Sequence, residues 1–385
     1  MRIALIQSTP NARFHSFPLL KIGAWRKDLG DECQLFKNEL PEPGEFEEIW
    51  ISAIFTYHIP HAAGLAKAAL QRTRRVLVGG VSPTLLPEYF EDLGCDVHHG
   101  LLLEAEKYPP DYSLLPGKPD RSITRTSLGC VRKCKFCMAR KLEPEFLDRP
   151  EWSQDLSDQT DKLTLWDNNW LAKPIEQLRR DTHELHRLVS FRRISEIDFG
   201  QALDCRLLTE EKADLMTGLP IYPVRFAFDH MRQDGYYQRA IEMMVERGFG
   251  IFISYKLYNF EDTPKTFYYR LKESVRLTEE LGAAVDSYPM CYQPIMKPDP
   301  KREYVGKHWT LHKKRAFRAI VGAISGPATT LTFHDRNSEW SPMREFEYWF
   351  GEDADEFDRL LSYPKIRDLV KIRKGKLRMM RARGE

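Results

Sequence analysis

Short apolar runs alternate with longer segments of helical periodicity through the first 111 residues. The pattern predicts strands at Arg2–Gln7, Cys33–Lys37, Ile49–Phe55, Arg75–Gly80 and Asp96–His99, and helices at Leu19–Leu29, His61–Gln71 and Pro87–Leu93. Strands that alternate with helices are typical of a parallel, doubly wound sheet. We therefore expect residues 1–111 to form an α/β, Rossmann-like domain that binds ligands at the carboxyl ends of its strands.

The alternation resumes after residues 112–122, a segment rich in turn-forming residues that we interpret as an inter-domain linker. The next strands are predicted at Ser122–Ser127, Leu163–Trp166, Ile194–Phe199, Val224–Phe228, Gly250–Tyr255 and Ala284–Tyr288, and the helices at Pro174–Leu188, Thr209–Met216, Gly235–Arg247 and Pro264–Leu281. Six strands in this rhythm predict a partial (β/α)6 TIM barrel over residues 123–300. Chemistry is then expected at the carboxyl ends of the barrel strands.

Residues 301–385 have a helical, charged pattern, and we expect a C-terminal helical extension. Helices are predicted at His308–Ile324, Arg344–Phe350 and Asp353–Leu361. Aromatic residues such as Trp349 either cover the barrel mouth or pack against its outer helices. The segment from Lys365 to Arg383 carries nine Lys and Arg against one acidic residue. Such a charge run is more typical of a solvated helix than of a nucleic-acid contact.

The composition excludes several classes of protein. A net charge of +2, from 58 basic and 56 acidic residues, argues against a polyelectrolyte partner for the whole surface. No apolar run approaches the length of a membrane span, and the chain opens directly as a strand rather than as a signal sequence. Seven cysteines, an odd number, suit a reducing compartment better than a disulfide framework. We expect a soluble, cytoplasmic protein without a membrane partner.

Three cysteines follow the first predicted barrel strand at the spacing CxxxCxxC: Cys130, Cys134 and Cys137. Three thiolates on one short loop can hold three irons of a cubane 4Fe-4S cluster and leave the fourth iron open to a chelating substrate. Basic residues within the loop, such as Lys133 and Lys135, favour the thiolate form.

A zinc knuckle is the alternative for these cysteines, and it needs a fourth ligand close by in sequence. His99 lies too far upstream, and no second cysteine pair follows. The spacing therefore favours the iron–sulfur cluster.

The CxxxCxxC spacing, with the aromatic Phe136 just before the last cysteine, resembles the signature of the radical S-adenosylmethionine (SAM) superfamily. In that family the open iron binds the amino and carboxylate groups of SAM, and one electron cleaves the sulfonium to a 5′-deoxyadenosyl radical. The resemblance implies an enzyme that abstracts hydrogen from an unreactive carbon. It also implies an electron donor such as a flavodoxin or ferredoxin.

The N-terminal domain resembles the cobalamin-binding domain that precedes the barrel in one subgroup of this superfamily. The resemblance is carried by Val78-Gly79-Gly80-Val81-Ser82-Pro83-Thr84, Leu86-Pro87-Glu88 and Glu104-Ala105-Glu106. It implies cobalamin as a further cofactor, with methyl transfer as the reaction. The Asp-x-His-x-x-Gly loop that supplies an axial histidine in many cobalamin proteins is missing, and we interpret His61 as a helix-start residue. A domain that kept the fold and lost the cofactor is the alternative.

Polar residues follow the second predicted barrel strand, in the stretch from Trp166 to Trp170. The stretch resembles the Asp-Asp-Asn-Phe segment of cobalamin-type radical SAM enzymes. The resemblance implies that Asp167, Asn168 and Asn169 accept hydrogen bonds from the amino group of SAM. An Asx turn that caps the next helix is the alternative.

The third and fourth strands also end in polar residues. Gln201, Asp204 and Arg206 are candidates to face the pocket, with Arg206 pairing the methionine carboxylate of SAM. A surface salt bridge is the alternative for Arg206. The resemblance implies that Asp229 contacts the ribose hydroxyls.

The resemblance further implies that Ile253, on the fifth strand, packs against the adenine, and that Phe136 adds a main-chain contact to the same base. Cys291, on the sixth strand, is a candidate catalytic residue that quenches a radical or holds a substrate. An inert buried thiol is the alternative for Cys291.

Two other functions remain open at this stage. A cobalamin-free radical SAM enzyme that modifies a nucleic-acid base would use the basic C-terminal segment. A non-catalytic iron–sulfur or electron-transfer protein would have no need for the polar residues at the strand ends.

Overall fold

The structure is a computed structural model that describes residues 1–10, 14–326, 330–334 and 340–383. The chain divides into two compact units. The first comprises Met1–Lys173, His183–Ile197 and Gln293–Arg302, and the second comprises Pro174–Thr182, Asp198–Tyr292 and Glu303–Glu385. The predicted linker at residues 112–122 lies inside the first unit, so the predicted domains do not coincide with these units. The division into 1–111, 123–300 and 301–385 stays a prediction.

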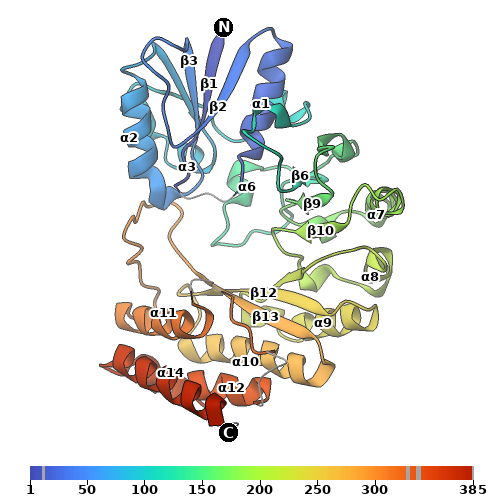
Figure 1. Ribbon diagram of the computed structural model, residues 1–385, viewed down its shortest axis with the longest axis vertical. Helices are drawn as coiled ribbons and strands as arrows, with labels where there is room; N and C mark the ends of the chain where they lie inside the picture. Colours follow the sequence, from blue (N-terminus) through green and yellow to red (C-terminus); the bar gives the residue numbers. More distant parts are fainter. Residues whose placement is uncertain (11–13, 327–329, 335–339, 384–385) are drawn as a thin grey trace. The chain divides into compact units, whose positions relative to one another are not determined.

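The first unit begins with a five-stranded sheet in the order β2-β1-β3-β4-β5. All neighbouring strands in it are parallel. The strands are β1 (Arg2–Gln7), β2 (Glu32–Lys37), β3 (Glu48–Ser52), β4 (Arg75–Gly79) and β5 (Asp96–Val97), and the helices between them are α1 (Phe17–Asp28), α2 (Ile59–Ala69), α3 (Val81–Leu85) and α4 (Glu88–Glu91). The predicted parallel α/β sheet is confirmed (Figure 1).

Alternation along β1 explains why this sheet is covered on both faces. Ile3 and Leu5 belong to a core cluster with Leu19 of α1, whereas Ala4 and Ile6 belong to a second cluster with Ala66 of α2. Successive side chains of a strand point to opposite faces, so an uninterrupted apolar run needs a helix on each side. The predicted helix His61–Gln71 begins two residues earlier, at Ile59, and His61 lies in its first turn.

The backbone conformation and close packing of Gly80 require a glycine. Its backbone has φ +108°, and an added Cβ would lie 2.7 Å from the carbonyl oxygen of Ala53. Only glycine fits such a left-handed position pressed against another backbone. The packing of the chain against Ala53 therefore accounts for Gly80 without a bound corrin.

The rest of the first unit holds β6 (Ser122–Thr124), β7 (Ser127–Leu128), β8 (Leu147–Asp148), β9 (Lys162–Leu165), α5 (Leu103–Glu106) and α6 (Ala139–Leu142). β10 (Glu196–Phe199) and α7 (Ile175–Ser190) contribute residues to both units. A three-stranded sheet has the order β10-β9-β6, and β7 pairs with β8 in antiparallel fashion. The predicted strand Ser122–Ser127 is thus interrupted at Arg125 and Thr126.

The second unit contains a parallel sheet of β11 (Val224–Ala227), β12 (Ile251–Tyr258) and β13 (Ala284–Cys291). Its helices are α8 (Glu210–Met216), α9 (Tyr236–Glu246), α10 (Pro264–Leu281), α11 (Leu311–Ser325), α12 (Pro342–Phe350), α13 (Ala354–Leu361) and α14 (Ile366–Arg383). All six predicted barrel strands are present in the predicted order. They form two three-stranded sheets, and the partial barrel stays a prediction.

Aromatic side chains hold the C-terminal helices together. Phe267 of α10, Phe317 of α11, Phe350 of α12 and Phe357 of α13 are fully buried in one cluster, and Trp349 belongs to it. This arrangement agrees with packing against an outer helix, the second of the two expectations for these aromatic residues. None of the helices in the described ranges combines the length and the apolar character needed to cross a lipid bilayer.

Candidate functional site

The three cysteines lie on the loop that connects β7 to β8, which we call the cysteine loop (residues 129–146). Two antiparallel residue pairs close its base, Ser127 with Asp148 and Leu128 with Leu147. Cys130 and Cys134 are half-buried, and Cys137 is exposed. Both ends of the cysteine triplet are thus attached to a fixed hairpin.

Backbone N–H groups already point at two of the sulfurs. The N–H of Arg132 donates to Sγ of Cys130 at 3.4 Å, and the N–H of Ala139 donates to Sγ of Cys137 at 3.4 Å. Hydrogen bonds to the sulfur orient a cysteine ligand and tune the cluster that it holds.

The type and number of these donors fit a cubane cluster that takes three protein thiolates. Within the part of the chain that the structure describes, no group of three or more His, Cys, Asp and Glu side chains is placed so as to hold a metal ion. The fit therefore rests on the chemistry of the donor set and on the N–H groups beside it.

Gly129 begins the cysteine loop in a conformation that other residues avoid. Its φ is +79°, and an added Cβ would lie 2.0 Å from the carbonyl oxygen of Glu145. Its N–H donates to Oε2 of Glu143 at 2.5 Å. A side chain at this position would force apart the two strands of the loop next to Cys130.

We expect Gly129→Ala to disturb the cysteine loop much more than Gly44→Ala. Gly44 has nearly the same φ, +78°, but no atom lies within 4 Å of its added Cβ. Both substitutions put a side chain in left-handed backbone, which costs on the order of 1–2 kcal/mol, but only Gly129→Ala also displaces Glu145. Urea unfolding should show a larger loss of stability for Gly129→Ala, and anaerobic reconstitution should show less iron. Equal behaviour of the two variants would contradict the account of the loop.

The polar stretch after β9 packs against the segment that leads into the cysteine loop. The carboxylate of Asp167 accepts hydrogen bonds from the N–H of Thr126 at 3.0 Å, from its hydroxyl at 2.8 Å, and from the hydroxyl of Ser127 at 2.6 Å. Burial raises the pKa of Asp167, and these hydrogen bonds together with Lys173 oppose the shift. Asp167 thus positions the chain in front of the cysteines. The contact of this stretch with SAM stays a prediction.

Asn168 also reaches the cysteine loop, since its Nδ2 donates to Oε2 of Glu143 at 2.7 Å. Asn169 is buried, at 3% exposure. The structure therefore places Asp167 and Asn168 against residues that flank the cysteine triplet on both sides, Ser127 and Glu143.

The remaining candidates belong to the second unit. Arg206 donates from Nε and Nη2 to the carboxylate of Asp204 at 2.7 and 3.0 Å. The pair corresponds to the salt bridge that we gave as the alternative for Arg206. The pairing of Arg206 with the methionine carboxylate of SAM stays a prediction. Gln201 is exposed, next to the turn that carries the other two.

Asp229 follows β11, and its Oδ1 accepts the N–H of Leu257 at 2.9 Å. Removal from water raises the pKa of this carboxyl to about 6, and the Leu257 N–H, Arg270 and Arg206 oppose that shift. Ile253 is half-buried on β12, in register with Arg225 of β11. The ribose and adenine contacts expected of Asp229 and Ile253 stay predictions.

Cys291 ends β13 and packs against the aromatic cluster of the C-terminal helices. Nδ2 of Asn259 lies 3.8 Å from its sulfur. This setting supports the inert thiol, and a catalytic role stays a prediction.

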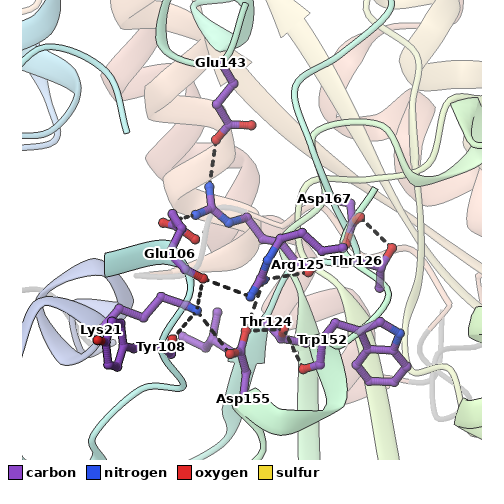
Figure 2. Close-up of polar contacts among 12 residues, drawn as sticks. Lys21, Glu106, Tyr108, Thr124, Arg125, Thr126, Glu143, Trp152, Asp155 and Asp167 are labelled. Atoms are coloured by element: carbon purple, nitrogen blue, oxygen red, sulfur yellow. Dashed lines mark hydrogen bonds and ion pairs between the residues drawn. The ribbon is translucent and has the colours of Figure 1, made fainter. Parts of the chain in front are cut away.

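Buried charged residues that the sequence did not predict surround the segment leading into the cysteine loop, as Figure 2 shows. Arg125 lies between Glu106 and Glu143, at 2.6 and 2.7 Å, and Lys21 contacts Asp155 at 3.1 Å. One signal was available. The run Thr124-Arg125-Thr126-Ser127 is entirely polar although it belongs to a predicted barrel strand, where apolar residues are expected, and buried polar side chains need partners.

The fold is similar to that of a solved structure, the radical S-adenosylmethionine methyltransferase TsrM from Kitasatospora setae, determined with cobalamin and a [4Fe-4S] cluster bound. The TM-score is 0.57 at 12% sequence identity, and the match covers 77% of this chain and 77% of the other. No protein-family model and no curated protein matches the sequence. At this identity the likeness shows the fold alone.

Proposed function

We propose that this protein is a radical SAM enzyme whose 4Fe-4S cluster is held by Cys130, Cys134 and Cys137. The cysteine loop carries the proposal: three thiols, two of them with N–H donors, on a hairpin connection fixed at its base. The cluster, when bound, supplies the electron that cleaves SAM to the 5′-deoxyadenosyl radical. The similar fold of a radical SAM methyltransferase supports the proposal.

The candidate residues have separate tasks in this proposal. Asp167 and Glu143 hold the backbone around the cysteines, and Asn169 accepts a hydrogen bond from the amino group of SAM. Asp229 and Ile253 serve the ribose and the adenine. For the methionine end of SAM we propose Arg206, Asp204 and Gln201, a role that only the resemblance to the radical SAM superfamily supports.

We further propose an acidic electron donor such as a flavodoxin or ferredoxin. Lys133, Lys135 and Arg140 are exposed on or next to the cysteine triplet, and Cys137 itself is exposed. A positive surface steers an acidic partner toward the cluster. We also propose a reducing, cytoplasmic setting, which an odd number of cysteines, seven, suits better than a disulfide framework does.

Cobalamin is the cofactor we propose for the sheet of the first unit, with methyl transfer as the reaction. Ligands of doubly wound sheets bind at the carboxyl ends of the strands. There, Phe55 and Tyr57 stack with centroids 5.1 Å apart after β3, and His61 contacts Asn38 of the β2 end at 3.0 Å. The cobalamin in the similar methyltransferase supports this step.

Anaerobic reconstitution of the full chain with iron, sulfide and hydroxocobalamin tests the proposal. We expect iron and sulfide at cluster stoichiometry, a corrin absorption band that persists through desalting, and 5′-deoxyadenosine or a methylated product when SAM and reductant are added. A cluster without retained corrin would support the cobalamin-free alternative, and salt-dependent retention of RNA or DNA would then point to a nucleic-acid base as substrate. A cluster that leaves SAM intact would leave only an electron-transfer protein.

A further inference from the structure

Four consecutive polar residues lead into the cysteine loop, and all of them are buried. Thr124, Thr126 and Ser127 are 0% exposed, and Arg125 is 7% exposed. Burying an unpaired polar group costs several kcal/mol, so a run of four implies that each has a dedicated partner. The partners come from segments far apart in the sequence.

Arg125 is the charged member of this run, and two carboxylates neutralise it. Its Nη2 contacts Oε1 of Glu106 at 2.6 Å, and its Nη1 contacts Oε1 of Glu143 at 2.7 Å (Figure 2). Glu106 ends α5, in the Glu-Ala-Glu segment that carried the resemblance to cobalamin-binding domains. In this structure its carboxylate serves the base of the cysteine loop.

The second oxygen of Glu143 reaches the cysteine loop itself. Oε2 accepts the N–H of Gly129 at 2.5 Å and the Nδ2 of Asn168 at 2.7 Å. Gly129 precedes the first cysteine, and Glu143 follows α6 after the last one. One carboxylate therefore joins the two ends of the cysteine triplet, and it fixes both to Arg125 and to the stretch after β9.

We propose that Glu143 is the positioning residue of the cysteine loop: its carboxylate closes the loop through Gly129 and Asn168, with Arg125 holding it in place. This inference deepens the proposed function and rests on it. Glu143 does not contact a thiol. It determines where the backbone of Cys130 lies, in the way that outer hydrogen bonds orient metal ligands in other proteins.

Three variants test the proposal. Glu143→Ala removes all three contacts. Glu143→Gln keeps the length and one oxygen, which can still accept from Gly129 and Asn168, while its amide faces Arg125. Glu145→Ala is the matched control, because Glu145 is an exposed residue of the same loop. After reconstitution of the full chain, the measurements are the rate of iron loss to a chelator, the electron paramagnetic resonance (EPR) spectrum of the reduced cluster, and the far-UV circular dichroism.

We expect Glu143→Ala to lose iron about 10- to 100-fold faster than the wild type, which is the usual effect of removing an outer partner of a metal ligand. Its EPR spectrum should broaden, whereas its circular dichroism should not change. Glu143→Gln should lose iron at a rate between those of the wild type and Glu143→Ala, because its carbonyl oxygen still accepts from Gly129 and Asn168 while its N–H donors face Arg125, which no longer holds the side chain. Glu145→Ala should behave as the wild type. If the ion pair with Arg125 were the only important contact of Glu143, Glu143→Ala and Glu143→Gln would lose iron equally fast.

Equal iron retention in Glu143→Ala and the wild type would overturn the proposal, and so would equal losses in Glu143→Gln and Glu143→Ala. If Glu143→Ala does not fold, Asn168→Asp tests the positioning role instead. This variant replaces the N–H donor to Glu143 by a second carboxylate and leaves Arg125 unchanged. Faster iron loss in Asn168→Asp supports the positioning role, and unchanged retention refutes it. A wild type that binds no cluster at all would refute the proposed function itself, which keeps the two failures distinct.

Discussion

Cys134→Ala is expected to abolish cluster binding and the release of 5′-deoxyadenosine, while the protein remains folded. Two thiolates cannot hold three irons of a cubane, and Cys134 is half-buried on a loop whose base is fixed by β7 and β8. Iron per chain after anaerobic reconstitution should fall from about four to background, and the visible charge-transfer absorption should disappear. Far-UV circular dichroism should match that of the wild type.

Cys291→Ala is the matched control for this prediction. Cys291 is also a half-buried cysteine, but it packs against the aromatic cluster of the second unit. Its removal should leave iron and sulfide unchanged. An equal loss of iron in both variants would mean that the ligands have been misassigned.

Asp155→Ala is expected to destabilise the first unit by about 3–5 kcal/mol, because it breaks a buried ion pair from one side. Asp155 is 2% exposed and accepts from Lys21 at 3.1 Å, from Thr124 at 2.6 Å and from Arg149 at 3.2 Å. Lys21 is itself 1% exposed, and burial lowers its pKa, an effect that Asp155 opposes. Without Asp155, the amine of Lys21 is left buried with only carbonyl acceptors. Urea unfolding measures the change in the free energy of unfolding.

Asp158→Ala is the control for Asp155→Ala. Asp158 lies three residues further on and also pairs with a cation, Arg193 at 2.8 Å, but its side chain is 97% exposed. Exposed pairs contribute at most about 1 kcal/mol, so this variant should unfold almost as the wild type does. Similar losses in both variants would show that burial of the Lys21–Asp155 pair does not govern the stability of this region.

The sequence predicted the parts of the fold that depend on local pattern. Uninterrupted apolar runs such as Ile3–Ile6 identified strands covered on both faces, and the helices between them followed from 3.6-residue periodicity. The cysteine loop was recognisable because its chemistry needs three thiols at short spacing within one segment. The helix boundaries were less accurate. Pro60 fits the first turn of α2, and the helix accordingly begins before the residue that we predicted.

The contacts around the cysteine loop could not be predicted in the same way, since they join residues far apart in the chain. Lys21 and Asp155 are separated by 134 positions, and Arg125 and Glu143 by 18. Nothing local distinguishes Glu143 from the exposed Glu145 two residues later. The contacts that the oxygens of Asp167 accept from Thr126 and Ser127 were not predicted, and the contact of the 167–169 stretch with SAM stays a prediction. Which polar residues face a ligand and which face the chain depends on tertiary contacts.

A three-thiolate cluster with one iron open to SAM is the central feature of the proposed enzyme. The decisive measurement is the EPR spectrum of the dithionite-reduced, anaerobically reconstituted full-length protein, recorded with and without SAM. We predict a reduced 4Fe-4S signal whose g-values shift when SAM is added, because the amino acid end of SAM binds the open iron. A protein that carries zinc, or a cluster signal that SAM leaves unchanged, would contradict the account.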